Sequence, residues 1–192
     1  MAPPHIPAGV SSMKGRLLVA TPSLGDPNFE YAVILLLAHG EDGAVGVVLN
    51  RPTGTDLSDP LPGWSRLAAE PPVVFVGGPV SPDAAICLAR SGPDEALDAY
   101  EPLMSSLGTL DLSVDPDEVA AGVQGVRVFV GYAGWAAGQL EEEIEAGAWW
   151  VVDASPDDAL SSEPEELWRS VLRRQPGRLA MFADYPPNPS VN

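Results

Sequence analysis

The feature that most constrains the fold is a set of short apolar runs, rich in Val, Ile and Leu, bounded by Gly, Pro, Asn and Asp. Runs of this length and composition predict strands, and the continuous ones predict strands covered on both faces. The longest run, residues 31–38, is far too short to cross a lipid bilayer. We therefore predict strands at 16–20, 31–38, 44–49, 73–76, 84–89, 107–112, 126–130 and 148–152, and a final strand or extended segment at 179–183.

Turn and capping signals place the remaining elements. Asp42-Gly43 predicts a hairpin turn within residues 39–43. Asp115 followed by Pro116 predicts a helix start, because Asp caps the first N–H groups and Pro suits the first helical position. We also expect a short helix at 64–70, a helix containing the glutamates at 141–143, a helical turn at 155–158 and a long last helix at 163–175, while residues 91–102 are interpreted as a surface excursion.

This mixture of elements predicts the fold class. A hairpin comes early and βαβ-like units come late, without strict alternation, which is typical of a mixed sheet in an α/β or α+β protein. The 192 residues suffice for one sizeable core. We expect residues 1–14 to form a disordered leader, with Met13 as a candidate natural start, and residues 15–192 to form a single domain. The leader lacks the basic and apolar regions of a secretory signal, so we place the protein in the cytoplasm.

The charge of the chain restricts its partners. With 27 acidic and 10 basic residues, the formal net charge is −17. Such a surface repels nucleic acids and anionic membranes, so we expect neither as a partner. Cys87 is the only cysteine and lies in an apolar run, which favours a buried, inert thiol. One cysteine and two histidines do not suggest a zinc site, and no metal or cofactor is predicted.

The stretch GYAGWAAGQLEEEIE, residues 131–145, follows a predicted strand and contains glycines at 131, 134 and 138. A strand, glycines and a helix in this order can cradle phosphates, but the spacing here is GxxGxxxG rather than GxGxxG. The glutamates at 141–143 would stabilise the helix start and repel a phosphate there. We therefore interpret the stretch as a tight strand-to-helix turn packed by Tyr132 and Trp135.

Two loops at predicted strand ends carry the candidate binding residues. Asn50-Arg51-Pro52 places an amide and a guanidinium at one exit, and Gly77-Gly78-Pro79 allows a close backbone approach at another. Ligands of open sheets favour such strand ends, and Arg51 would attract an anion. The alternative is that Arg51 pairs with a local carboxylate. If the loops meet at one edge, the predicted ligand-binding residues are Asn50, Arg51, Gly77, Gly78, Tyr132, Trp135 and Gln139.

No catalytic constellation is evident from the sequence. A G-x-S-x-G nucleophile motif is absent, and the two histidines are His5 in the leader and His39 on the hairpin. We therefore assign no catalytic residue and expect a non-enzymatic regulatory or binding protein that takes a small anion or a protein segment. The alternatives are a hydrolase or transferase that uses the same crevice, with Glu or His39 as base, and a transcriptional regulator.

Several segments together carry a family resemblance: GRLLVATPSLGDPNFEYAVILLLAHGEDGAVGVVLNRP (15–52), VGGPV (76–80), GYAGWAAGQLEEEI (131–144), LWRSVLRR (167–174) and PSVN (189–192). In this order and spacing the chain resembles the AlgH/YqgE family of small bacterial proteins. The resemblance implies a compact fold with a strongly bent mixed β-sheet flanked by helices. It implies no reaction, and a regulatory role only through one member's proposed part in alginate production. The chain departs from the family pattern at Ala32, where the family has Ser, and at Ala89, where a His often follows Leu; a function shared by the whole family therefore does not require that His as a base.

Overall fold

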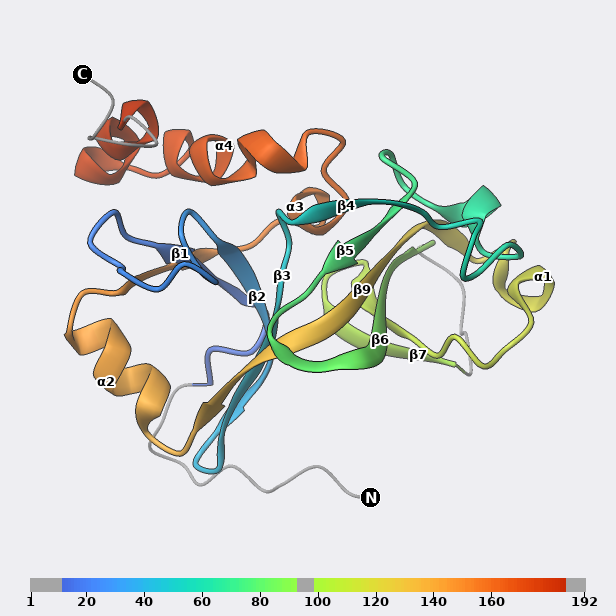
Figure 1. Ribbon diagram of the computed structural model, residues 1–192, viewed down its shortest axis with the longest axis horizontal. Coiled ribbons are helices and arrows are strands. Elements are labelled where there is room, and N and C mark those ends of the chain that lie inside the picture. The colour runs from blue at the N-terminus through green and yellow to red at the C-terminus, as the bar shows by residue number, and fades with distance from the viewer. Residues whose placement is uncertain (1–11, 93–98, 186–192) are drawn as a thin grey trace.

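The computed structural model describes residues 12–92 and 99–185. Strands dominate the architecture (Figure 1). In chain order they are β1 (Arg16–Ala20), β2 (Val33–Gly40), β3 (Gly43–Val48), β4 (Pro52–Asp56), β5 (Val73–Val76), β6 (Val80–Ser91), β7 (Tyr100–Met104), β8 (Leu107–Leu110), β9 (Val123–Ala136) and β10 (Trp149–Asp153).

Within the described ranges these strands form one 10-stranded, strongly curled sheet. Its main path runs β10–β1–β2–β3–β9–β6–β8–β7, and β5 joins β9 on the side that carries β4. The pairing is antiparallel except between β5 and β9. The expected strong bend is therefore confirmed, but the sheet is mostly antiparallel and the expected late βαβ units are absent from the described residues.

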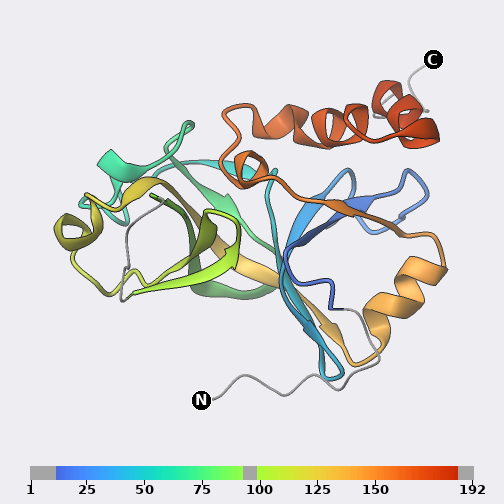
Figure 2. The same cartoon turned by 180° about the vertical axis from the view of Figure 1, so that it is seen from behind.

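Strand β9 is the longest strand of the described residues, and it pairs with strands on both sides of the sheet (Figures 1 and 2). Its first part pairs with β6 and its last part with β3. The predicted strand-to-helix turn within 131–145 is therefore shorter than expected: residues 131–136 continue the strand, and the turn is confined to residues 137 and 138. Gly131, Ala133 and Trp135 are buried while Gly134 and Ala136 are exposed, which is the alternation of a strand with one covered face.

Helices are few and short in the described residues: η1 (Ser65–Leu67), α1 (Pro116–Val119), α2 (Gln139–Glu145), α3 (Pro156–Ala159), η2 (Pro164–Glu166), α4 (Leu167–Arg173) and η3 (Gly177–Asp184). Asp115 caps α1 as predicted, accepting a hydrogen bond from the Asp117 N–H at 2.9 Å. Ser155 forms a capping box with Asp158 at α3. Local capping chemistry was therefore a sound guide to where these helices begin.

Other predictions required correction. The segment 179–183 is not a strand but part of the 3-10 helix η3, in which Leu179, Phe182 and Ala183 are spaced to face the core together. Only residues 65–67 of the expected helix at 64–70 are helical. Strand β4 was not predicted, because Pro52 suggested an end rather than a start. Strand β7 begins inside the expected surface excursion at 91–102 and runs past its end to Met104, and residues 93–98 of that excursion fall outside the described ranges.

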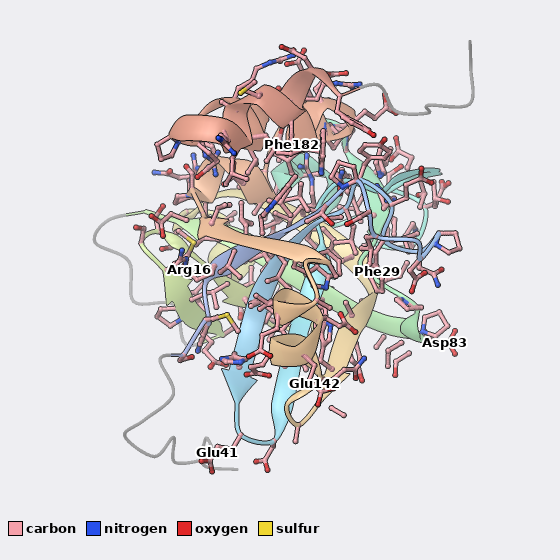
Figure 3. All side chains as sticks on the ribbon, turned by 90° about the vertical axis from the view of Figure 1, so that its left-hand side faces the viewer. Arg16, Phe29, Glu41, Asp83, Glu142 and Phe182 are labelled. Atoms are coloured by element: carbon pink, nitrogen blue, oxygen red, sulfur yellow. The ribbon has the colours of Figure 1, made fainter. Side chains whose placement is uncertain are left out.

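Three hydrophobic clusters fill the described part of the molecule. The first cluster lies between the sheet and the helices α4 and η3. The second lies between the sheet and α2, and the third includes Val119 of α1 (Figure 1). Figure 3 shows α2, marked by Glu142, packed beside the β2–β3 hairpin whose tip is marked by Glu41. The hairpin agrees with the Asp42-Gly43 prediction, since Gly40 pairs with Gly43.

Most of the expected leader, residues 1–14, lies outside the described residues, and so does the tail from residue 186. Ser12 and Met13 are described, and both contact the β2–β3 hairpin. The Ser12 hydroxyl donates to the His39 carbonyl at 3.3 Å, and the Met13 N–H donates to His39 Nδ1 at 3.1 Å.

Candidate functional site

Asn50 and Arg51 follow β3 directly and are fixed by local hydrogen bonds. Asn50 is buried, its Oδ1 accepting from the Val33 N–H at 2.9 Å and its Nδ2 donating to the Tyr31 carbonyl at 2.8 Å. Tyr31 adopts a positive φ of 54°, an uncommon conformation for a bulky residue. Asn50 thus holds the entry to β2 in place, and it presents Arg51 beside it.

Arg51 forms no ion pair with any side chain in the described ranges. Its guanidinium donates to the Asn50 carbonyl at 3.3 Å and to the Glu30 carbonyl. Burial lowers the pKa of Arg51, and the nearby Glu30 charge acts in the opposite direction. An arginine remains charged despite such a shift, so a partly desolvated cation stands at this strand end. The contact with Glu30 is made to its backbone, not to its carboxylate as the alternative interpretation requires.

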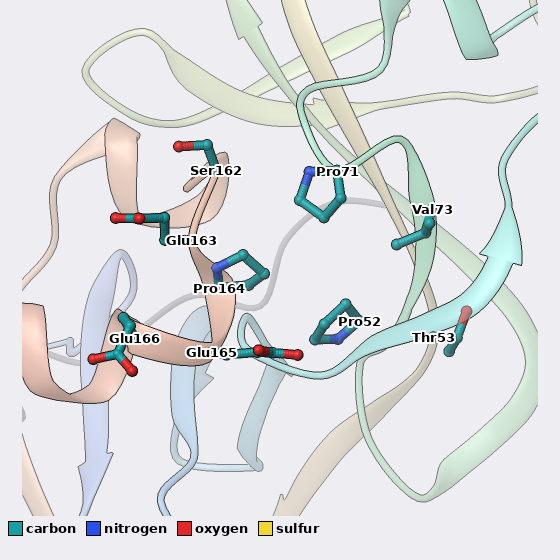
Figure 4. Close-up of a pocket in the computed structure, with 9 residues that line it drawn as sticks. All are labelled: Pro52, Thr53, Pro71, Val73, Ser162, Glu163, Pro164, Glu165 and Glu166. Carbon is teal, nitrogen blue, oxygen red and sulfur yellow. The ribbon is translucent and has the colours of Figure 1, made fainter.

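Three neighbouring cavities surround Arg51 and Pro52. The Trp168 cavity, about 240 Å³, is lined by Tyr31, Asn50, Arg51, Glu165, Trp168 and Arg169. The Gly78 cavity, about 350 Å³, is lined by Pro27, Asn28, Val48, Arg51, Pro52, Val76, Gly78 and Pro79. The β4 cavity, about 660 Å³, is lined by Pro52, Thr53, Pro71, Val73, Ser162, Glu163, Pro164, Glu165 and Glu166 (Figure 4).

The cavities differ in the charge of their walls. Glutamates line the β4 cavity on one side, and Figure 4 shows Glu165 extending toward Pro52. The Gly78 cavity has Arg51 as its one charged residue, and the Trp168 cavity combines Arg51 and Arg169 with Glu165. An anion is therefore better accommodated on the two sides of Arg51 than in the β4 cavity.

Gly77 and Gly78 allow two parts of the sheet to cross closely. The Gly77 N–H donates to the Val130 carbonyl, and the Gly77 carbonyl accepts from the Val48 N–H, both at 2.8 Å. A Cβ on Gly77 would lie 2.3 Å from the Gly131 carbonyl oxygen. The close approach predicted from these glycines is made to the protein's own backbone, and Gly78 alone of the two also lines a cavity.

Trp135 and Gln139 lie at the opposite end of β3 from Arg51. Trp135 pairs with Ala44 near the start of β3, whereas Arg51 lies seven residues further along the chain. At ~3.3 Å per residue this separates the two by roughly 20 Å. The structure therefore brings Asn50, Arg51 and Gly78 together, but it leaves Tyr132 within β9 and places Trp135 and Gln139 elsewhere.

Trp135 and Gln139 instead share a partner in Glu143 of α2. One carboxylate oxygen, Oε2, accepts from the Trp135 Nε1–H at 3.0 Å and from the Trp149 Nε1–H at 2.9 Å. The other, Oε1, accepts from Gln139 Nε2 at 3.0 Å. The two indoles form an edge-to-face pair with centroids 6.2 Å apart. The third glutamate of the LEEEI motif therefore anchors α2 to the sheet.

Replacing Glu143 with alanine is expected to destabilise the protein by about 2–3 kcal/mol, because two buried indole N–H groups lose their acceptor. Urea unfolding followed by tryptophan emission measures the effect. The matched control is Glu142→Ala, which changes the exposed neighbouring residue in the same helix and should shift stability by less than about 0.5 kcal/mol. Equal effects from the two variants would refute the anchoring role of Glu143.

His39 does not face the cavities around Arg51. Its side chain is 1% exposed, its Nε2 lies 2.7 Å from Glu141 Oε1, and its Nδ1 accepts from Met13. Both ring nitrogens are therefore engaged in contacts that join the N-terminal segment, the hairpin and α2. This geometry gives no support to His39 as a general base at the Arg51 site.

Sequence reasoning missed four residues of the Trp168 cavity: Tyr31, Glu165, Trp168 and Arg169. Tyr31 was interpreted as the first residue of a strand, and the other three as parts of the last helix. Arg169 pairs with Glu166, one residue beyond Glu165, at 3.7 Å. The available signal was the LWRSVLRR motif, although nothing in it indicated which strand end it would cover.

Cys87 is buried as predicted, and burial raises the pKa of its thiol to about 12, so it stays protonated at neutral pH. Across residues 12–92 and 99–185, no three His, Cys, Asp or Glu side chains gather as metal ligands. The same residues contain no helix with the length and apolar character needed to cross a membrane.

Comparisons with known proteins identify the family. Residues 17–180 match the AlgH-like family. A UPF0301 protein of Streptomyces avermitilis is 53% identical over 187 residues, covering 95% of this chain and 97% of the relative. Neither name states an activity.

Solved structures agree with this assignment. A Corynebacterium diphtheriae protein superposes with a TM-score of 0.86 at 30% identity, covering 94% of this chain and 95% of that one. The solution structure of AlgH from Pseudomonas aeruginosa gives a TM-score of 0.67 at 30% identity, covering 95% and 98%. Sequence motifs, family match and fold agree, and the chain belongs to the AlgH-like family.

Proposed function

We propose that this protein is a binding protein that takes a small anion, or the carboxylate of a protein segment, at Arg51. The proposal rests on the burial, the hydrogen bonds and the position of the Arg51 guanidinium. It is partly buried, its hydrogen bonds within the described residues are to backbone carbonyls only, and it forms the wall between two cavities in a chain of net charge −17. Arg127 likewise donates to backbone carbonyls, but unlike Arg51 it lines none of the three cavities.

The hydrogen-bonding capacity of Arg51 supports this role. A guanidinium has five N–H donors in a planar fork, and the two described bonds leave the rest available. The fork geometry suits a carboxylate or phosphate, and partial burial strengthens the attraction by lowering the local dielectric. A bound anion would therefore gain charge-assisted bonds without displacing a protein carboxylate.

Arg51→Met is expected to weaken the binding of acetate, phosphate or sulfate at least tenfold, since the charge and the donors are both removed. Chemical shift changes of the backbone amides near residues 48–52 and 76–79 would report binding to the folded protein. The control is Arg173→Met, which removes the same charge from an exposed position that lines none of the three cavities. Absence of binding to the wild type, or equal losses in both variants, would contradict the proposal.

A further inference from the structure

The Trp168 cavity holds opposite charges that do not neutralise each other. Arg51 enters from the end of β3, and Glu165 enters from η2. Within the described ranges neither forms an ion pair with a side chain, and they do not pair with each other. Arg169, the third charged residue of the cavity, contacts Glu166 at 3.7 Å and not Glu165. A guanidinium and a carboxylate with unused bonding capacity therefore both border this small space, and Glu165 stands on the boundary between it and the β4 cavity.

Two aromatic side chains, Tyr31 and Trp168, also line this cavity, and packing and hydrogen bonds fix their positions. The rings of Tyr31 and Trp168 meet edge to face with centroids 4.9 Å apart. Trp168 is buried, and its Nε1–H donates to the Ala20 carbonyl at 2.9 Å. Asn50 fixes the Tyr31 backbone at its positive φ. Backbone held in such a sparsely populated conformation often marks a preorganised site, and the rings offer an apolar surface to a short hydrocarbon spacer.

Size and net charge restrict the ligand. The volume of about 240 Å³ is below the range of pockets for drug-sized ligands, so the ligand is of roughly amino-acid size. A simple anion would meet repulsion from Glu165 inside the cavity and from the net charge of −17 outside it. A molecule with one carboxylate and one ammonium group has no net charge, and it pairs with both unused groups.

We propose that the Trp168 cavity binds a small zwitterion, an amino acid with a short apolar spacer, whose carboxylate contacts Arg51 and whose ammonium group contacts Glu165. This inference rests on the proposed anion site at Arg51 and specifies its ligand. Arg169 assists with the carboxylate, and the rings of Tyr31 and Trp168 contact the spacer.

The test compares two series of increasing chain length by amide chemical shifts of the wild-type protein. The zwitterions are glycine, 4-aminobutanoate and 6-aminohexanoate, and the anions are acetate, butanoate and hexanoate. At the best length, the zwitterion is expected to bind at least tenfold more tightly than the anion of the same length. The preferred length then measures the distance between the two charged groups.

Glu165→Gln separates this inference from the proposed function. The variant is expected to reduce zwitterion binding to the level of the matched anion while leaving anion binding unchanged or slightly stronger, and Arg51→Met should weaken both. The control Glu163→Gln makes the same change in charge at a residue that lines the β4 cavity but not the Trp168 cavity. If anions bind as tightly as zwitterions and Glu165→Gln changes neither, the zwitterion inference fails and the anion site stands. If neither series binds, both fail.

Discussion

Gly131→Ala is expected to destabilise the protein by about 3–5 kcal/mol, a large share of the ~5–15 kcal/mol that stabilises a typical domain. Gly131 has a φ of +70°, where an alanine Cβ is strained by about 1–2 kcal/mol. The added Cβ would also lie 2.3 Å from the Gly78 carbonyl oxygen. Neither backbone can retreat, because Gly77 is bonded to β3 and β9 on both sides.

Urea unfolding monitored by circular dichroism measures this loss. The control is Gly54→Ala in β4, where the φ is not positive and no atom of the described residues lies within 4 Å of the added Cβ. It should change stability by less than about 1 kcal/mol. A Gly131→Ala variant as stable as Gly54→Ala would show that the crossing of β9 and the β5–β6 connection is looser than described. Gly77→Ala should also destabilise the protein, since its Cβ would meet the Gly131 carbonyl oxygen at the same distance, but by less, because Gly77 does not share the positive φ of Gly131.

Arg127→Met is expected to cost a similar amount, about 3–5 kcal/mol, because it leaves three backbone carbonyls without their charged donor. Arg127 is 2% exposed and lies in β9. Its guanidinium donates to the carbonyls of Glu70 at 2.5 Å, Ser161 at 2.8 Å and Ala159 at 3.2 Å. It also lies over the Phe75 ring, 4.3 Å from the centroid. This one side chain therefore joins β9 to two segments that are distant in sequence.

Burial lowers the pKa of Arg127 to about 10, so the group stays charged at neutral pH. Arg127→Lys keeps the charge but replaces the planar fork with a single ammonium group, so it should recover only part of the lost stability. The control Arg66→Met removes an exposed arginine that pairs with Asp117, and it should cost about 1 kcal/mol or less. Unfolding in urea ranks the three variants, and an Arg127→Met effect no larger than that of Arg66→Met would contradict the joining role.

Predictions that depended on neighbouring residues in the sequence were the reliable ones. The Asp42-Gly43 turn, the Asp115 cap and the cores of β1, β5 and β10 all follow from local geometry or apolar runs. Predictions failed where a distant partner decided the outcome. Gly131, one of the glycines that suggested a turn, instead permits β9 to continue beneath Gly77 and Gly78, because it carries no side chain to collide with that backbone.

The same distinction between local and distant interactions applies to the residues of the candidate site. The sequence by itself determined that Asn50 and Arg51 stand together at a strand end, that the net charge is −17 and that the chain resembles a known family. Only the tertiary structure decided that the last helix covers this strand end, so that Tyr31, Glu165, Trp168 and Arg169 line a cavity with Arg51. It also decided that Trp135 and Gln139 donate hydrogen bonds to Glu143, at the opposite end of β3 from Arg51. The physical reason is that strand register and helix docking are set by packing across the whole core, while capping and turn chemistry act over a few residues.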